Sequence, residues 1–162
     1  MGEVLDIEFR AYASADLGDF REMVFALYYE DPEGLPITEE KIVRTADESL
    51  LRPEKVRIIM IRSGGINVGY GLLTFCWSNE YGGDVVRMDE VYVRPEWRGK
   101  RAGASFIEYV LETYKDAALF EVETTSSNEG AMRLYLDCGF EVSGNRFLVR
   151  GSQMNGSLLA EV

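Results

Sequence analysis

The pattern of apolar and polar positions at the start of the chain predicts one strand followed by two helices. DIEFRAY (6–12) has the residue pattern of a strand. From Ala15 to Tyr29 the apolar residues recur at helical spacing, with Ser14 placed to cap the helix. The segment EDPEGLP (30–36) then breaks the pattern. A second helix follows, and Thr38 is its expected N-cap.

The middle of the chain predicts three strands. KVRIIMI (55–61) and NVGYGLLTFCW (67–77) are apolar runs of strand length, joined by the glycine-rich turn RSGGI (62–66). After a second turn-like stretch, DVVRMDEVYV (84–93) has the pattern of a third strand, and Pro95 ends it. These segments therefore predict an antiparallel block.

The last third of the chain alternates helices and strands. Apolar residues follow helical spacing from Ala102 to Tyr114, and LFEVETT (119–125) is a predicted strand. NEGAMRLYLDCG (128–139) is a predicted helix that its final glycine stops. FEV (140–142) and RFLVRG (146–151) are predicted to be two short strands.

The element order β-α-α-β-β-β-α-β-α-β-β mixes hairpins with crossover connections. It predicts an α/β fold, a three-layer sandwich built around a mixed sheet. We expect one domain over residues 1–162, because no internal repeat or low-complexity linker divides the chain, with residues 151–162 as a loose tail.

Composition narrows the chemistry. The 162 residues include no histidine, which excludes serine–histidine and cysteine–histidine nucleophile systems and most zinc sites, so no metal is expected. The formal net charge of −11 disfavours nucleic acid as a partner and would suit a cationic substrate, although acidity also serves solubility. The apolar runs are too short to span a bilayer, and two cysteines make no disulfide framework, so a cytoplasmic location is expected.

One short segment concentrates positive charge in this acidic chain. VRPEWRGKRAGASF (93–106) runs from the end of a predicted strand into a predicted helix and contains two glycines. Free amides and the helix dipole at such a junction form an anion site, and glycine lets a ligand approach the backbone. The alternative is a surface loop whose cations offset neighbouring carboxylates. The cations are Arg94, Arg98, Lys100 and Arg101.

The same segment resembles a known signature. VYVRPEWRGKRAG is similar to the first motif of the GNAT acetyltransferase superfamily, in which a strand and Val-x-Pro precede Arg/Gln-x-x-Gly-x-Gly/Ala. NEGAMRLYLDCGF is similar to the second motif, Asn-x-x-Ala-x-x-Leu-Tyr-x-x-x-Gly-Phe. The motif positions are Asn128, Ala131, Leu134, Tyr135, Gly139 and Phe140. The motifs follow the family's order and cover about the second half of the chain, and the element order matches the family fold.

The resemblance implies binding of acyl-CoA, usually acetyl-CoA, as co-substrate. The strand segment Val91 to Val93 would pair with the pantetheine arm, next to a bulge that splays this strand from its neighbour. Amides of the loop would cradle the pyrophosphate, and Asn128 would bond the pantetheine or cap its helix. Arg101 stands where the family has its first loop glycine, a costly choice if the backbone there is left-handed. The cofactor-binding candidates are Val91, Tyr92, Val93, Arg98, Gly99, Lys100, Arg101, Ala102, Gly103, Ala104 and Asn128.

The resemblance also implies catalytic residues. Tyr135 stands where relatives place a tyrosine acid near the sulfur, although its spacing also fits a core position. Asp89 and Glu90 stand where relatives hold a carboxylate that accepts the amine proton. Because neighbouring strand residues alternate faces, we expect only one of them to face the cleft, and Glu90 is narrowly preferred. Both could instead be solvated carboxylates at a strand end. Cys138 is not expected to act as a nucleophile.

In this family the segment between the first two helices lines the acceptor side, here LYYEDPEG (27–34). Its aromatic rings and carboxylates could hold a cation, or they could form an acidic surface turn. The acceptor-binding candidates are Tyr28, Tyr29, Glu30, Asp31, Glu33, Trp77 and Tyr81.

The resemblance therefore predicts an acyl-CoA-dependent N-acyltransferase that transfers acetyl to a primary amine by direct attack. The acceptor would be a small-molecule or protein amine. The alternatives are a non-catalytic acyl-CoA-binding or regulatory module with the same fold, and an anion-binding domain without CoA. Relatives are often dimers, so a homodimer is compatible with the resemblance, although nothing in the sequence identifies an interface.

Overall fold

A five-stranded sheet and four α-helices make up the residues that this computed structural model describes, 6–32 and 34–151. In chain order the elements are β1 (Ile7–Ala11), α1 (Leu17–Glu30), α2 (Glu39–Leu51), β2 (Val56–Ser63), β3 (Ile66–Ser78), β4 (Gly83–Val93), α3 (Ala102–Thr113), β5 (Leu119–Val122) and α4 (Glu129–Asp137). Short 3-10 helices lie at Ser14–Asp16 and Pro95–Trp97.

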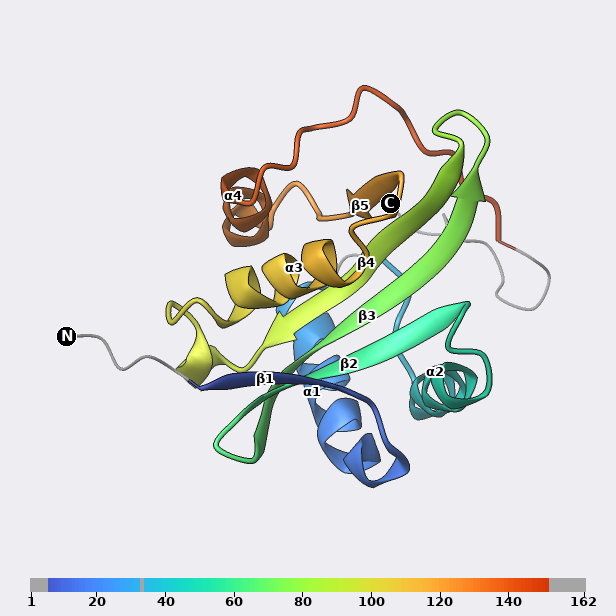
Figure 1. Ribbon diagram of the computed structural model, residues 1–162. Helices are drawn as coiled ribbons and strands as arrows, with labels where there is room; N and C mark the ends of the chain where they lie inside the picture. Colours follow the sequence, from blue (N-terminus) through green and yellow to red (C-terminus); the bar gives the residue numbers. More distant parts are fainter. Residues whose placement is uncertain (1–5, 33, 152–162) are drawn as a thin grey trace.

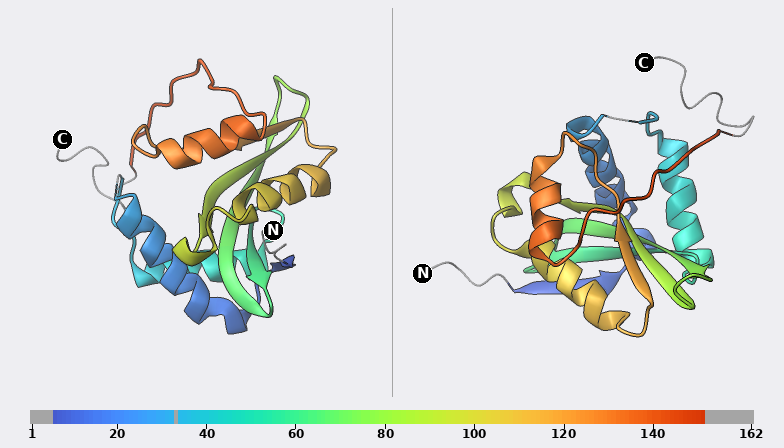
Figure 2. Two further views of the ribbon diagram at one scale, coloured as in Figure 1. Left: turned by 90° about the vertical axis from the view of Figure 1, so that its left-hand side faces the viewer. Right: turned by 90° about the horizontal axis from the view of Figure 1, so that it is seen from above.

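The sheet has the order β1-β2-β3-β4-β5, with antiparallel pairing throughout except for the parallel pair β4–β5. Helices α1 and α2 cover one face, and α3 and α4 cover the other (Figures 1 and 2). This is the predicted mixed sheet between helical layers, an α/β fold.

Each face of the sheet has its own apolar core. Phe20 and Met23 of α1 and Ile42 of α2 pack on one face. Phe106 and Ile107 of α3 pack on the other with strand residues such as Leu73, Met88 and Val93. Gly71 of β3 sets how closely α3 approaches, because a Cβ at this position would overlap the Phe106 ring. The helix therefore lies tight against the sheet at its N-terminal half.

Strand β4 carries a bulge at Asp89. Leu72 of β3 pairs with Glu90, whereas Leu73 pairs with Met88, so Asp89 is one residue extra. Met88 and Val91 both pack against the core below α3. The two residues between them therefore lie on the opposite face, and the expectation that Asp89 and Glu90 would alternate faces is wrong.

Strands β4 and β5 separate beyond the bulge. Their pairing covers Val85–Met88 against Leu119–Val122, and within the described residues it stops there. On the β5 side, Val91 and Val93 thus have no strand partner in the described chain, although β3 still pairs with them on the other side. The splayed strand that the resemblance implied is present.

Two predictions about local structure are wrong. Residues 140–151 form no strand: Phe147 is 75% exposed and Leu148 is 96% exposed, and the segment joins no ladder of the described sheet. Apolar, β-branched composition favours a strand, but a strand also needs a neighbouring edge to pair with. Ser14 does not cap the first helix; instead the Asp16 carboxylate accepts a hydrogen bond of 2.8 Å from the Ala13 amide.

Thr38 caps α2 as predicted, since its Oγ1 accepts from the Lys41 amide at 3.3 Å. No helix among residues 6–32 and 34–151 is long and apolar enough to cross a membrane.

Candidate active site

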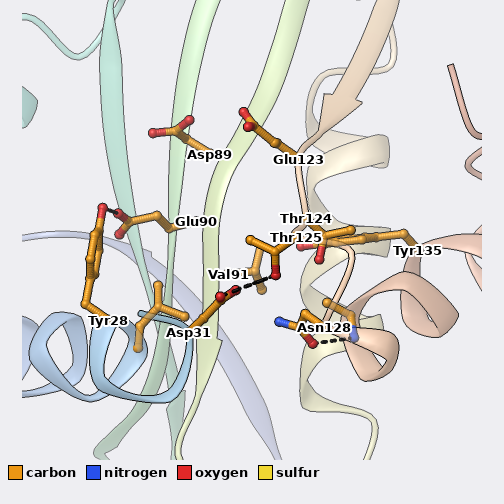
Figure 3. Close-up of a pocket in the computed structure, with 12 residues that line it drawn as sticks. Tyr28, Asp31, Asp89, Glu90, Val91, Glu123, Thr124, Thr125, Asn128 and Tyr135 are labelled. Carbon is orange, nitrogen blue, oxygen red and sulfur yellow. Dashed lines mark hydrogen bonds between the residues drawn. The ribbon is translucent and has the colours of Figure 1, made fainter. Parts of the chain in front are cut away.

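A cavity of about 260 Å³ opens where β4 and β5 separate. It lies between the C-terminal end of α1, the bulge of β4, the segment after β5 and the first turns of α4 (Figure 3). Its lining residues are Leu27, Tyr28, Asp31, Asp89, Glu90, Val91, Glu123, Thr124, Thr125, Asn128, Ala131 and Tyr135. The splayed strands thus gather predicted catalytic, cofactor and acceptor residues around one space.

Two phenols hold the Glu90 carboxylate. The Tyr28 hydroxyl donates to Oε1 at 2.8 Å, and the Tyr70 hydroxyl donates to Oε2 at 2.6 Å. Burial raises the pKa of Glu90, and these two hydrogen bonds oppose that rise. Burial beside Glu90 also raises the pKa of both tyrosines, so the phenols stay protonated as donors. Glu90 is therefore a fixed carboxylate.

Asp89 lies beside Glu90 in the same cavity with a different environment. None of the described residues donates a hydrogen bond to its carboxylate. Burial raises its pKa, Arg87 opposes that rise, and the Glu123 carboxylate adds to it. Asp89 is thus the less restrained of the two carboxylates and the better placed to exchange a proton.

Tyr135 faces the cavity from α4 on the opposite side (Figure 3). The residue is 7% exposed, and its ring meets that of Phe140 edge-on with centroids 5.9 Å apart. Burial is the main reason that the pKa of Tyr135 rises to about 12, so the hydroxyl is protonated at neutral pH. The Asn128 side chain caps α4 by accepting from the Ala131 amide at 3.0 Å.

The cavity is strongly acidic. Four carboxylates line it, those of Asp31, Asp89, Glu90 and Glu123, and no lysine or arginine does. Thr125 ties Asp31 to the wall through Oγ1, which donates at 3.1 Å to Oδ2. An acidic cavity favours a cationic guest such as an ammonium group.

Of the acceptor-binding candidates, only Tyr28 and Asp31 line this cavity. Tyr29, Trp77 and Tyr81 are exposed elsewhere, and Glu30 forms an ion pair with Arg98. Glu33 lies outside the described residues.

The sequence did not point to every residue of the cavity. Glu123, Thr124 and Thr125 were assigned to a strand, but β5 ends at Val122 and the chain turns toward the cavity. Leu27 and Ala131 have helical spacing that indicates only a buried face. Tyr70 is fully buried in β3, and only its partner Glu90 reveals its role.

The loop before α3 has the backbone of an anion site. Gly99 and Arg101 are both left-handed, with φ of 72° and 66°. The Ser105 amide donates to the Arg101 carbonyl at 2.8 Å, so the amides of Ala102, Gly103 and Ala104 precede the first helical hydrogen bond. These amides are free to bind a phosphate.

The basic side chains of this loop are mostly engaged with the protein itself. Arg98 binds both oxygens of Glu30, at 2.7 and 3.0 Å, and donates to the Val93 carbonyl at 2.8 Å. Arg101 pairs with Glu108 at 2.8 Å. Lys100 lies over the Trp97 ring, 5.4 Å from its centroid. The backbone amides of the loop are therefore more available to an anion than the arginine side chains.

Among the described residues, no three or more histidine, cysteine, aspartate or glutamate side chains are arranged so that they could hold one metal ion.

A family model described as "Acetyltransferase (GNAT) family" matches residues 20–140. The chain belongs to this family. Among curated proteins, it is 33% identical over 78 residues to the thialysine N-ε-acetyltransferase of Sus scrofa. That alignment covers 47% of this chain and 45% of the relative, so the chain matches about half the length of the curated relative.

Solved structures share the GNAT fold over most of the chain. An integron cassette protein from the mobile metagenome of Cole Harbour Salt Marsh is 30% identical, with a TM-score of 0.75 over 88% of this chain and 89% of that one. The aminoglycoside acetyltransferase AAC(6')-Iy, solved with a bisubstrate analogue of CoA, is 17% identical, with a TM-score of 0.72. The latter match covers 90% of this chain and 98% of the other.

The two glycine positions of the GNAT loop motif, 101 and 103, have different structural roles in this chain. Arg101, at the family's first loop glycine, adopts the left-handed conformation that glycine would adopt without strain. Gly103 lies against α4, where an added Cβ would sit 3.2 Å from Leu134 Cδ2. Gly103 thus makes room for helix packing, so a bulky residue there would disturb α4 as well as the phosphate path.

Proposed function

We propose that this protein is an acyl-CoA-dependent N-acyltransferase that transfers acetyl from acetyl-CoA to a primary amine by direct attack. The observation that carries the proposal is the cavity at the β4–β5 split. It has the Asp89 and Glu90 carboxylates on one wall and the Tyr135 hydroxyl on the other. The names of the relatives, acetyltransferases of thialysine and of aminoglycosides, agree with an amine acceptor.

The residues around the split fit an acyl-CoA. The backbone of Val91 is unpaired toward the described β5, so it offers a strand edge to an amide-containing arm; at Val93 the carbonyl already accepts from Arg98. The amides of Ala102 to Ala104 and the left-handed Gly99 suit a pyrophosphate. When bound there, acetyl-CoA supplies an acetyl group activated as a thioester.

The chain's own residues then manage two protons. Asp89, whose carboxylate has no described hydrogen-bond donor, takes one proton from the bound ammonium, directly or through water, so that the neutral amine can attack the thioester carbonyl. The second N–H proton leaves as the C–N bond forms, and through water it restores the proton that Tyr135 gives to the sulfur. Glu90, whose oxygens each accept from a phenol, orients the ammonium beforehand. Tyr135 gives its proton to the sulfur as the C–S bond breaks. The sequence narrowly favoured Glu90 as the base, and the two phenol contacts favour Asp89.

The experiment is to follow thiol release from acetyl-CoA in the presence of a panel of primary amines, with separate titration of acetyl-CoA binding. We expect amine-dependent thiol release with formation of an N-acetyl product. Binding of acetyl-CoA without turnover of any amine would instead favour a non-catalytic module. Absence of binding at low salt would contradict CoA recognition altogether.

A further inference from the structure

A second hollow adjoins the acidic cavity. It has a volume of about 520 Å³ and lies between α2 and strands β2 to β4, on the face of the sheet that α1 and α2 cover. Asp89 lines both hollows, so they meet at the proposed proton acceptor. We call the second hollow the α2 groove; its lining residues are Lys41, Arg44, Thr45, Glu48, Arg52, Lys55, Val56, Leu72, Thr74 and Asp89.

The α2 groove is rich in cations, in a chain whose net charge is −11. Arg52 and Lys55 share the Glu48 carboxylate, at 2.6 and 3.0 Å. Lys41 Nζ donates to the Pro36 carbonyl at 2.8 Å, which leaves its charge uncompensated. Arg44 has no carboxylate within ion-pair distance among the described residues. Four cations therefore stand against the single Glu48 carboxylate, and Lys41 and Arg44 are the two that have no ion pair among the described residues.

The positions of these two cations follow from the helix. Residues 41, 44, 45 and 48 follow the three- and four-residue spacing of one side of α2, and Arg52 follows them at the C-cap. Val56 and Leu72 provide an apolar floor between the helix and Asp89. A guest that spans the groove would thus meet a carboxylate at one end, apolar contacts in the middle and cations at the other end.

We propose that the α2 groove binds the carboxylate end of the amine acceptor, so that the substrate is a small zwitterionic amine of the amino-acid type. This inference rests on the proposed function, because it needs the amine of the same molecule to reach Asp89. A purely cationic acceptor such as a diamine would meet Arg44 and Lys41 unfavourably. The adjoining hollows together have the size of a small-molecule site.

Matched pairs of acceptors test the proposal. L-lysine and cadaverine differ by one α-carboxylate, and so do L-ornithine and putrescine. The kcat/KM of each is measured by thiol release for the wild type, Arg44→Ala, Arg44→Glu and the control Lys115→Ala. Lys115 is an exposed lysine after α3 that lines neither hollow, and its substitution matches the charge change of Arg44→Ala.

We expect the wild type to prefer the carboxylate member of a pair. Arg44→Ala should lower kcat/KM for that member on the order of fivefold to tenfold, and the effect should be strongest at low salt. The kcat/KM for the diamine should change little. Arg44→Glu should reverse the preference, and Lys115→Ala should change neither. Two outcomes would overturn the inference and leave the acetyltransferase proposal intact. One is that Arg44→Ala affects both members of a pair equally, and the other is that the wild type turns over the diamine as well as the amino acid. No turnover of any amine would overturn both.

Discussion

Replacing Tyr135 by phenylalanine removes the proposed acid and keeps the ring. The ring meets Phe140 at 5.9 Å, and none of the described residues forms a hydrogen bond with the hydroxyl. The unfolding free energy should therefore change by about 0.5 kcal/mol or less. The same substitution removes the hydroxyl that could protonate a departing thiolate. The other described donors nearby, the Asn128 amide and the hydroxyls of Thr124 and Thr125, are far weaker acids than a phenol.

The kinetic effect follows from the state of the hydroxyl. With a pKa of about 12, on the order of one molecule in ten thousand is ionised at pH 8, so nearly every enzyme carries the proton. A lost general acid typically lowers the rate roughly a hundredfold or more, or about 2.7 kcal/mol of barrier. We expect kcat to fall by this factor, with the KM for acetyl-CoA nearly unchanged.

The assay measures kcat at saturating acetyl-CoA and acceptor, beside a thermal unfolding curve. Tyr109→Phe is the matched control: Tyr109 stacks on Phe9 at 4.6 Å in α3 and does not line the cavity. Because the pKa of Tyr135 lies near 12, an alkaline limb below pH 10 belongs to another group and should persist in the variant. Full turnover in a folded Tyr135→Phe protein would refute the assignment.

Substitutions at four further positions test other parts of the molecule. Arg10 lowers the pKa of Asp16 from 3.8 to about 2, so Asp16→Asn should lose about 2 kcal/mol of stability in neutral denaturation curves. Because the pKa is depressed, this loss should be full above pH 4 and vanish as the pH falls through 2. Asp89→Asn should lower kcat roughly a hundredfold and remove the acidic limb of the pH profile, which burial moves to higher pH by raising the pKa of Asp89. Glu90→Gln should chiefly raise the KM for the amine, and equal pH profiles for both variants would contradict this division. Arg101→Gly should be more stable than Arg101→Ala by about 1 kcal/mol in thermal unfolding, because only glycine relieves the left-handed backbone; equal stabilities would contradict the strain.

Local signals predicted most of the fold. Thr38, the glycine-rich turn at 62–66 and Pro95 mark element ends in the sequence, and the structure ends its elements close to them. The two strands predicted within 140–151 were wrong because their apolar pattern is local, whereas strand formation depends on a partner edge elsewhere. Ser14 was wrong as a cap because it is itself the first residue of the 3-10 turn Ser14–Asp16, whose N-cap residue is Ala13.

The site was harder to predict than the fold. The motifs placed Tyr135 and the loop before α3, but nothing local shows that Asp89 is an extra residue in its strand. The resemblance implied a bulge near this segment, but the residue that forms it depends on the pairing of two strands and cannot be read from one of them. For the same reason the phenol of Tyr70, 20 positions from Glu90 in sequence, could not be assigned to it.

The bulge also determines which side chains of β4 face the α1 side of the sheet and which face the α3 side. An uninterrupted strand gives residues 88, 90 and 92 to one face, but here Met88 and Tyr92 lie in different cores. A strand that kept all its residues but lost the bulge would turn Tyr92 to the α3 side. Deleting residue 89 would instead remove the bulge and leave Glu90 and Tyr92 on the α1 side and Val91 and Val93 on the α3 side. The extra residue therefore places a second carboxylate beside Glu90 without changing which neighbouring side chains of β4 enter either core.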